Sequence, residues 1–137
     1  MRVPIDDALY LIVAGDADLD EALEEAAFGT VGLTLEAHAQ VLFVSTIDPE
    51  TEWVDLEIRQ LAAAPDGELD DLASEWGPWD FGQIHAESPV EIHTLERVPT
   101  GAVTKEAGDY EVALFGRPAD QGVERHLLLV WPEPSFE

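Results

Sequence analysis

The sequence predicts a mainly β protein, an antiparallel β-sandwich with one short N-terminal helix. Three observations support this fold class: apolar runs of strand length recur along the chain, turn residues separate them, and helical spacing is confined to one early segment. A chain of 137 residues can bury about two thirds of its extended surface in one core. Because no internal repeat divides it, we expect a single domain over residues 1–137.

The N-terminal part contains a predicted strand followed by the predicted helix. Residues 8–13 are continuously apolar over the length of a strand. Residues 16–28 change period, since Leu19 and Leu23 fall on one helical stripe and the glutamates face away from it. Asp18 is a suitable N-cap, and acidic residues in the first turn suit the helix dipole. This segment therefore predicts a short helix.

Strand patterns dominate the remainder of the chain. Apolar runs and alternation predict strands at 31–36, 41–46, 53–61, 90–98, 110–115 and 125–131. The alternation in 53–61 slips by one residue, which predicts a β-bulge. The last two strands should form a hairpin with a loose connection over the turn-rich residues 116–122. Residues 62–88 interrupt the pattern, because carboxylates and aromatic residues are mixed there with glycine and proline.

The charge of the chain restricts its partners. Acidic residues outnumber basic ones by 30 to 6, which gives a formal net charge of −24. Charges of one sign repel one another and weaken the compact state. The phosphates of nucleic acids and anionic lipids require Lys and Arg on the protein, so neither is an expected partner. A basic protein is the expected partner instead.

No motif in the sequence indicates catalysis or a bound metal. Asp16, Asp18 and Asp20 begin like a calcium-binding loop, but Glu21 stands where that loop needs Gly and Ala27 where it needs Glu. The four histidines lack metal-ligand spacing, and cysteine is absent. We therefore expect no enzyme activity, metal or cofactor. No segment has the length of a membrane span or signal peptide, so a cytoplasmic location is expected.

Two acidic segments are the candidate partner-binding surface. Carboxylates can steer a basic partner, and aromatic residues can supply the buried anchors of an interface. In the other interpretation, the same aromatic side chains close one end of the sandwich as core. The predicted contacts are Asp18, Asp20, Glu21, Glu24 and Glu25 on the predicted helix, and Asp66, Glu68, Asp70, Asp71, Glu75, Trp76, Trp79 and Asp80 in the later segment.

The order of several local patterns resembles a known family. Residues 18–23 lead into residues 32–37 and then into the apolar residues 41–44. Near the C-terminus, residues 107–112 are followed by a loop and by the apolar residues 127–130. This order is similar to the competence protein J family of small acidic bacterial proteins, which includes an inhibitor of a competence-associated nuclease. The resemblance spans roughly half of the chain and rests on helix-to-strand and turn-to-strand signals.

The resemblance implies a β-sandwich-like fold and a role as an inhibitor or immunity protein. The chain departs from the family in its Trp-rich acidic segment and its larger negative charge, so the target stays open and no individual inhibitory residue carries over. From the residues, two alternatives remain. One is a housekeeping domain whose acidity reflects a salt-adapted or high-GC proteome. The other is a small enzyme or ligand-binding sandwich that uses histidines and carboxylates.

Overall fold

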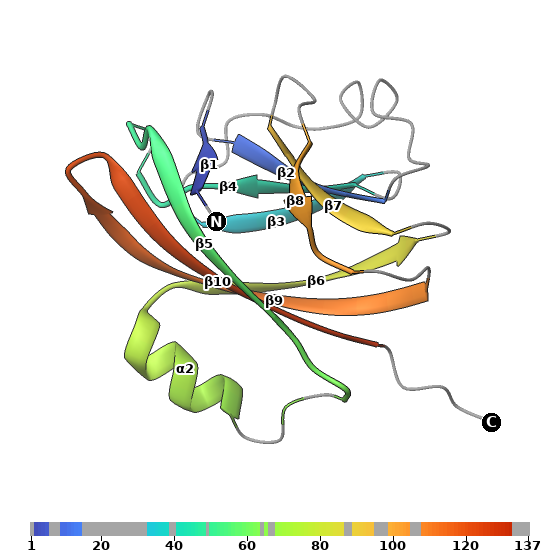
Figure 1. The fold of residues 1–137 in the computed structure, drawn as a ribbon. Helices are drawn as coiled ribbons and strands as arrows, with labels where there is room; N and C mark the ends of the chain where they lie inside the picture. Colours follow the sequence, from blue (N-terminus) through green and yellow to red (C-terminus); the bar gives the residue numbers. More distant parts are fainter. Residues whose placement is uncertain are drawn as a thin grey trace.

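In the part of the chain that the structure describes, two five-stranded sheets pack face to face and a helix lies on the outer side of one of them (Figure 1). The computed structural model describes residues 2–5, 9–14, 33–38, 41–48, 50–63, 65, 68–86, 89–94, 99–104 and 108–132. This mainly β sandwich confirms the predicted fold class. The predicted helix at 16–28 lies outside the described residues.

We call the two sheets sheet I and sheet II. Sheet I has the order β1 (Arg2–Pro4), β5 (Trp53–Gln60), β10 (Val123–Pro132), β9 (Gly108–Asp120) and β6 (Trp79–Ala86). Sheet II has the order β3 (Thr34–His38), β4 (Val41–Ser45), β2 (Leu9–Ala14), β7 (Val90–Thr94) and β8 (Pro99–Ala102). All neighbouring strands pair antiparallel except β5 and β10, which run parallel. Antiparallel pairing therefore dominates both sheets, as the predicted fold class requires.

The core fills the space between the sheets, and its residues follow the alternation of the strands. The side chains of β2 are buried along its whole length, as the apolar run predicts. Val54 and Leu56 of β5 enter the same core as Leu114 of β9 and Leu128 of β10. Burying each such side chain contributes about 1.5–3 kcal/mol of hydrophobic free energy. This core fixes which face of sheet I points outward.

The predicted β-bulge in residues 53–61 is wrong. The pairing of β5 runs without a shift along both β1 and β10. The slip in the hydrophobic pattern has another cause: Trp53 lies on the outer face with the charged residues and is 40% exposed. Val54 and Leu56 hold the inward positions instead. Trp53 is therefore an exposed aromatic residue on a regular strand.

The predicted loose connection over 116–122 is also wrong. β9 continues to Asp120, and only Gln121 and Gly122 form the turn to β10. Both turn residues have positive φ, 55° and 80°, the left-handed backbone that tight two-residue hairpin turns need. The pairing of β9 with β10 shifts register between Val123 and Arg125, and Pro118 of β9 lies opposite this shift. The strand tolerates the proline because regular ladder hydrogen bonding is interrupted there. The predicted hairpin itself is confirmed.

Residues 62–88, for which the sequence predicts no regular element, contain α2 (Glu68–Trp76) and β6. Leu69, Leu72 and Trp76 recur at helical spacing and pack against Phe115 and other outward residues of sheet I, in a second apolar cluster outside the sandwich core. The helix ends where Gly77, at φ 118°, donates its N–H to the Ala73 carbonyl at 3.2 Å. None of the described helices is long and apolar enough to cross a bilayer.

Candidate functional site

The outer face of sheet I, together with the helix that covers it, contains five of the six predicted contacts whose side chains the structure describes. Helix α2 packs over the middle of this face, on β9 and β10 (Figure 1). Two parts of the face stay open: the strip along β6 and the area over β5 and the start of β10. We describe the helix first, then these two parts.

The solvent side of α2 is acidic. Asp70, Asp71 and Glu75 are exposed there, since the apolar positions of the helix face the sheet. Glu75 lies 3.7 Å from the guanidinium of Arg117, a partly exposed ion pair that contributes little to stability. The Asp70 and Asp71 carboxylates are in no ion pair among the described residues. These two carboxylates can therefore meet a basic partner.

Two aromatic rings stand beside the helix on β6. Trp79 is 42% exposed and Phe81 is 41% exposed. Trp79 stacks on Phe115 at a centroid distance of 5.7 Å and an interplanar angle of 15°. Phe81 lies 5.7 Å from the ring of Trp131, at an angle of 58°. Both rings are thus held on the sheet by an aromatic contact while a large part of their surface remains open to solvent.

Trp76 combines the two roles that the sequence left open. Its side chain belongs to the apolar cluster under α2, which is the core interpretation. Its ring is also covered by guanidinium groups, with Arg117 at 4.5 Å and Arg125 at 5.8 Å from the centroid. Cation–π contacts of this kind contribute about 0.5–1 kcal/mol at exposed sites. Trp76 therefore joins the helix to the sheet and also borders an open surface.

Asp80 points to the other side of β6. Its two carboxylate oxygens accept hydrogen bonds from the backbone N–H of Leu35 at 2.7 Å and of Phe81 at 2.8 Å. The first bond links β6 of sheet I to β3 of sheet II. Of the other predicted contacts, Glu68 lies in α2 but its side chain is outside the described part, and those outside the described residues altogether are Asp18, Asp20, Glu21, Glu24, Glu25 and Asp66.

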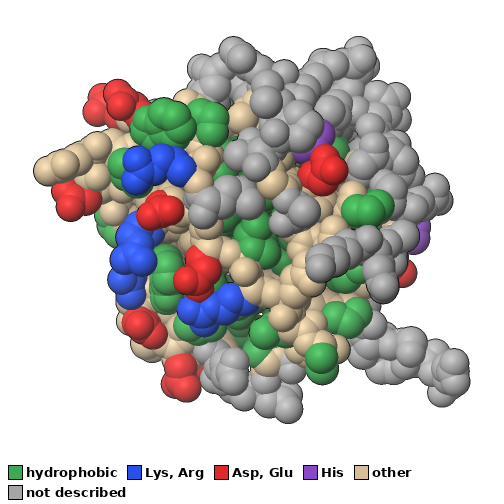
Figure 2. Space-filling view, viewed as in Figure 1, with side chains coloured by type: hydrophobic (Ala, Val, Ile, Leu, Met, Phe, Trp, Pro, Cys, Tyr) green, Lys and Arg blue, Asp and Glu red, His purple; other side chains and the backbone are tan. Residues whose placement is uncertain are grey.

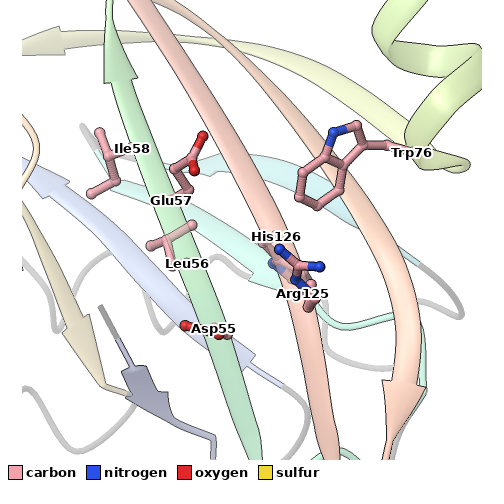
Figure 3. Close-up of a pocket in the computed structure, with 7 residues that line it drawn as sticks. All are labelled: Asp55, Leu56, Glu57, Ile58, Trp76, Arg125 and His126. Carbon is pink, nitrogen blue, oxygen red and sulfur yellow. The ribbon is translucent and has the colours of Figure 1, made fainter.

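A groove of about 470 Å³ opens beside Trp76 over β5 and β10. Asp55, Glu57 and Arg125 line it together with Trp76 (Figure 3). Glu57 forms a 2.5 Å ion pair with Arg59, farther along the same strand. The sequence prediction missed this groove, although the charged residues alternating along 53–61 mark an exposed strand face. The groove also needs Trp76 of α2 and Arg125 of β10, which are distant from β5 in the sequence. No local sequence pattern therefore reveals the groove.

The basic residues are distributed unevenly. The described ones are Arg2, Arg59, Arg117 and Arg125, and all four occupy outward positions of sheet I. On the surface seen in Figure 2, arginine side chains (blue) lie close to Asp and Glu side chains (red), with hydrophobic groups between them. This face is therefore mixed in charge even though the whole chain carries −24.

A buried polar network lies between the sheets. The Tyr10 O–H is 2.6 Å from Nδ1 of His126, and Nε2 of His126 contacts the Glu124 carboxylate. Glu124 also accepts the backbone N–H groups of Ile47 at 3.0 Å and Asp48 at 3.1 Å. Burial, and to a smaller extent the charge of Glu124, raise the pKa of Tyr10. Tyr10, His126 and Glu124 are fully buried, so this network holds the fold together and cannot contact a substrate.

Among the described residues, no group of three or more histidine and carboxylate side chains is arranged to hold a metal ion. No family model matches the sequence. No curated protein matches it either.

Two solved structures share the fold. ComJ from Bacillus subtilis, an inhibitor of the DNA degrading activity of NucA, superposes with a TM-score of 0.65 over 97% of this chain and 94% of its own, at 10% identity. The product of crocagin biosynthetic gene J superposes with a TM-score of 0.57 over 98% and 96%, at 13% identity. The chain thus has a ComJ-like fold, which confirms the fold that the family resemblance implied.

Proposed function

We propose that this protein is a non-enzymatic inhibitor of a nuclease or another basic nucleic-acid-binding protein, and that it binds its target through α2 and β6. The observation that carries the proposal is the position of an acidic helix surface beside two exposed aromatic rings. Asp70 and Asp71 supply charge, while Trp79 and Phe81 supply apolar area. The two carboxylates lie on α2 and the two rings on the neighbouring strand β6, and α2 packs on the same outer face of sheet I that presents the rings.

The electrostatic part of the proposal follows from how nucleic-acid-binding proteins work. Such proteins present arrays of Lys and Arg spaced to meet phosphates. Carboxylates on α2 can occupy such an array in place of phosphates. The net charge of −24 attracts a basic target over long range and accelerates encounter, an effect that salt screens. The acidic residues of the predicted helix at 16–28 remain predicted contacts of the same kind.

The aromatic part supplies affinity that charge alone does not. Trp79 and Phe81 are each held by an aromatic neighbour in the sheet, so little side-chain freedom is lost when a partner covers them. Large aromatic side chains at the centre of an interface often dominate its binding energy. The fold supports an inhibitory role as well, since ComJ, one of the two solved structures sharing it, is an inhibitor of a DNA degrading activity.

A nuclease-inhibition assay tests the proposal. Purified basic bacterial nucleases degrade DNA with and without the protein, at low and at molar salt. We expect at least one nuclease to be inhibited and its inhibition to weaken as salt rises. Trp79→Ala should weaken inhibition of that nuclease by about thirtyfold or more, the range of an interface hot spot. If no basic protein is inhibited or bound, or if molar salt leaves binding unchanged, the proposed function is wrong.

A further inference from the structure

A row of charged side chains crosses the outer face of sheet I beside the groove. Arg2 of β1 pairs with Asp55 of β5, which pairs in turn with Arg125 of β10. Arg125 pairs on its other side with Arg117 of β9. Directly paired residues place their side chains on the same side of a sheet. These four residues therefore form one line, which we call the arginine row.

The composition of the arginine row is unusual for this chain. The sequence has six basic residues against thirty acidic ones, yet the row contains three arginines and one aspartate. Like charges that face each other on neighbouring strands destabilise the pair, and Arg117 directly opposes Arg125. Among the described residues, neither Arg2 nor Arg125 is in an ion pair. A local arrangement that opposes stability in this way often marks a binding site.

The row is held in position at the groove. Arg125 and Asp55 both line it, and Trp76 forms a wall (Figure 3). The guanidinium groups of Arg117 and Arg125 lie 4.5 and 5.8 Å from the Trp76 ring centroid, so one indole restrains two neighbouring cations. A restrained planar guanidinium presents its N–H groups as a fork that matches a carboxylate.

We propose that the arginine row binds one carboxylate side chain, an Asp or Glu, of the basic partner protein. This inference rests on the proposed function. It adds a positively charged contact beside the acidic binding surface of α2. The acidic surface of α2 receives the basic residues of the partner, while Arg117 and Arg125 receive its acidic residue. A basic protein that lacks a carboxylate at this position leaves Arg125 in the interface without an ion pair among the described residues, whereas Arg117 keeps its pair with Glu75. The row therefore selects among basic proteins.

The charge of the whole chain favours a protein carboxylate over a phosphate. A polyanion such as DNA is repelled by the net charge of −24 before it reaches the row. A basic partner is attracted by the same net charge, so it can bring one carboxylate to the row while the overall electrostatic interaction stays favourable.

Two matched peptides test the inference without knowledge of the partner. One is a capped peptide with lysines on both sides of a central glutamate, and the other has glutamine in place of that glutamate. Arginine Nε–H resonances of the intact protein are followed by NMR as each peptide is added. The glutamine peptide is the more basic of the two. Attraction to an acidic protein alone therefore predicts that it binds more tightly.

The arginine row predicts the opposite order. We expect the glutamate peptide to bind about threefold more tightly than the glutamine peptide, the effect of one exposed ion pair. The resonances of Arg117 and Arg125 should shift only with the glutamate peptide. In Arg125→Gln this preference should disappear. In the matched control Arg59→Gln, which removes the same charge from the Glu57 pair on the same face, it should remain.

Four results would overturn the inference. If the glutamine peptide binds more tightly, the row does not accept a carboxylate, although the proposed function stands because basic peptides still bind. If Arg125→Gln keeps the preference for glutamate, the preference arises elsewhere. If inorganic phosphate shifts the same resonances at the same concentration as the glutamate peptide, the row is a general anion site. If neither peptide binds at low salt, both the inference and the proposed function fail. Thermal melting of each variant verifies that it is folded.

Discussion

The hydroxyl group of Tyr10 lies 2.6 Å from Nδ1 of His126, and this contact joins the two sheets through their fully buried interior. Tyr10 belongs to β2 in sheet II and His126 to β10 in sheet I. When Nε2–H of His126 donates to Glu124, Nδ1 accepts the hydrogen bond from Tyr10. Tyr10, His126 and Glu124 thus form one hydrogen-bonded series, which helps to fix how the two sheets face each other.

Removal of the Tyr10 hydroxyl should destabilise the fold. Tyr10→Phe leaves Nδ1 of His126 buried without this hydrogen bond, and such a loss typically lowers the free energy of unfolding by about 1–3 kcal/mol. Urea unfolding followed by circular dichroism measures the change. His85→Gln is the control, because His85 is exposed and should alter stability little. Equal stability of Tyr10→Phe and the wild type would show that the contact contributes nothing.

The raised pKa of Tyr10 predicts that the protein loses stability at alkaline pH. The pKa of this tyrosine is raised in the folded protein, so above pH 10 the unfolded chain releases a proton that the folded chain keeps. The stabilisation is complete below pH 10 and decreases as pH rises towards the pKa of the folded state. Over that window the wild type should lose about 1.4 kcal/mol per pH unit more than Tyr10→Phe. Parallel slopes in urea unfolding of the two proteins would contradict this.

Asp80 should contribute to stability rather than to binding. Asp80→Ala removes the acceptor for Leu35 N–H at the β3–β6 edge, so the free energy of unfolding should fall by about 1–3 kcal/mol. Asp70→Asn removes the same charge from the exposed surface of α2 and should change stability by less than about 0.5 kcal/mol. Chemical denaturation of both variants measures the contrast. Equal stability losses would show that the Leu35 contact is not specific.

The glycine that ends α2 should resist substitution. Gly77 has φ 118°, a backbone conformation that residues with a Cβ rarely adopt. Gly77→Ala should therefore lower the free energy of unfolding by about 1 kcal/mol or more. Gly82→Ala is the matched control, since its Cβ would meet only side chains at ordinary contact distances of 3.5 and 3.6 Å. Thermal melting compares the two, and an equal effect would contradict the assigned role of Gly77.

The sequence was sufficient for strands that are buried on both faces. β2 and β4 are continuous apolar runs, and both formed where expected. The prediction failed where an aromatic side chain points outward: Trp53 looked like a core residue and suggested a bulge. It failed also at 62–88, because Gly77 and Pro78 suggested an irregular segment although they only separate α2 from β6.

Long-range pairing explains most of what the sequence could not predict about the site. Nothing local to Arg2, Arg117 or Arg125 shows that β1, β5, β10 and β9 place them in one row with Asp55. Trp79 was predicted as a contact because aromatic residues and carboxylates are mixed in its segment, and its role in binding stays a prediction. The position of Trp79 on the outer face still depends on the register of β6 with β9.

The most direct test of the central claim is the association rate constant with an inhibited basic nuclease, measured at low salt by stopped-flow. Two double variants each remove two negative charges: Asp70→Asn/Asp71→Asn on α2, and the control Glu50→Gln/Glu52→Gln, whose exposed residues lie outside α2 and β6. We expect the α2 variant to associate about tenfold more slowly than the wild type and the control to slow by less than about twofold. Equal slowing of the two variants would mean that only total charge matters, and the proposed binding surface would be wrong.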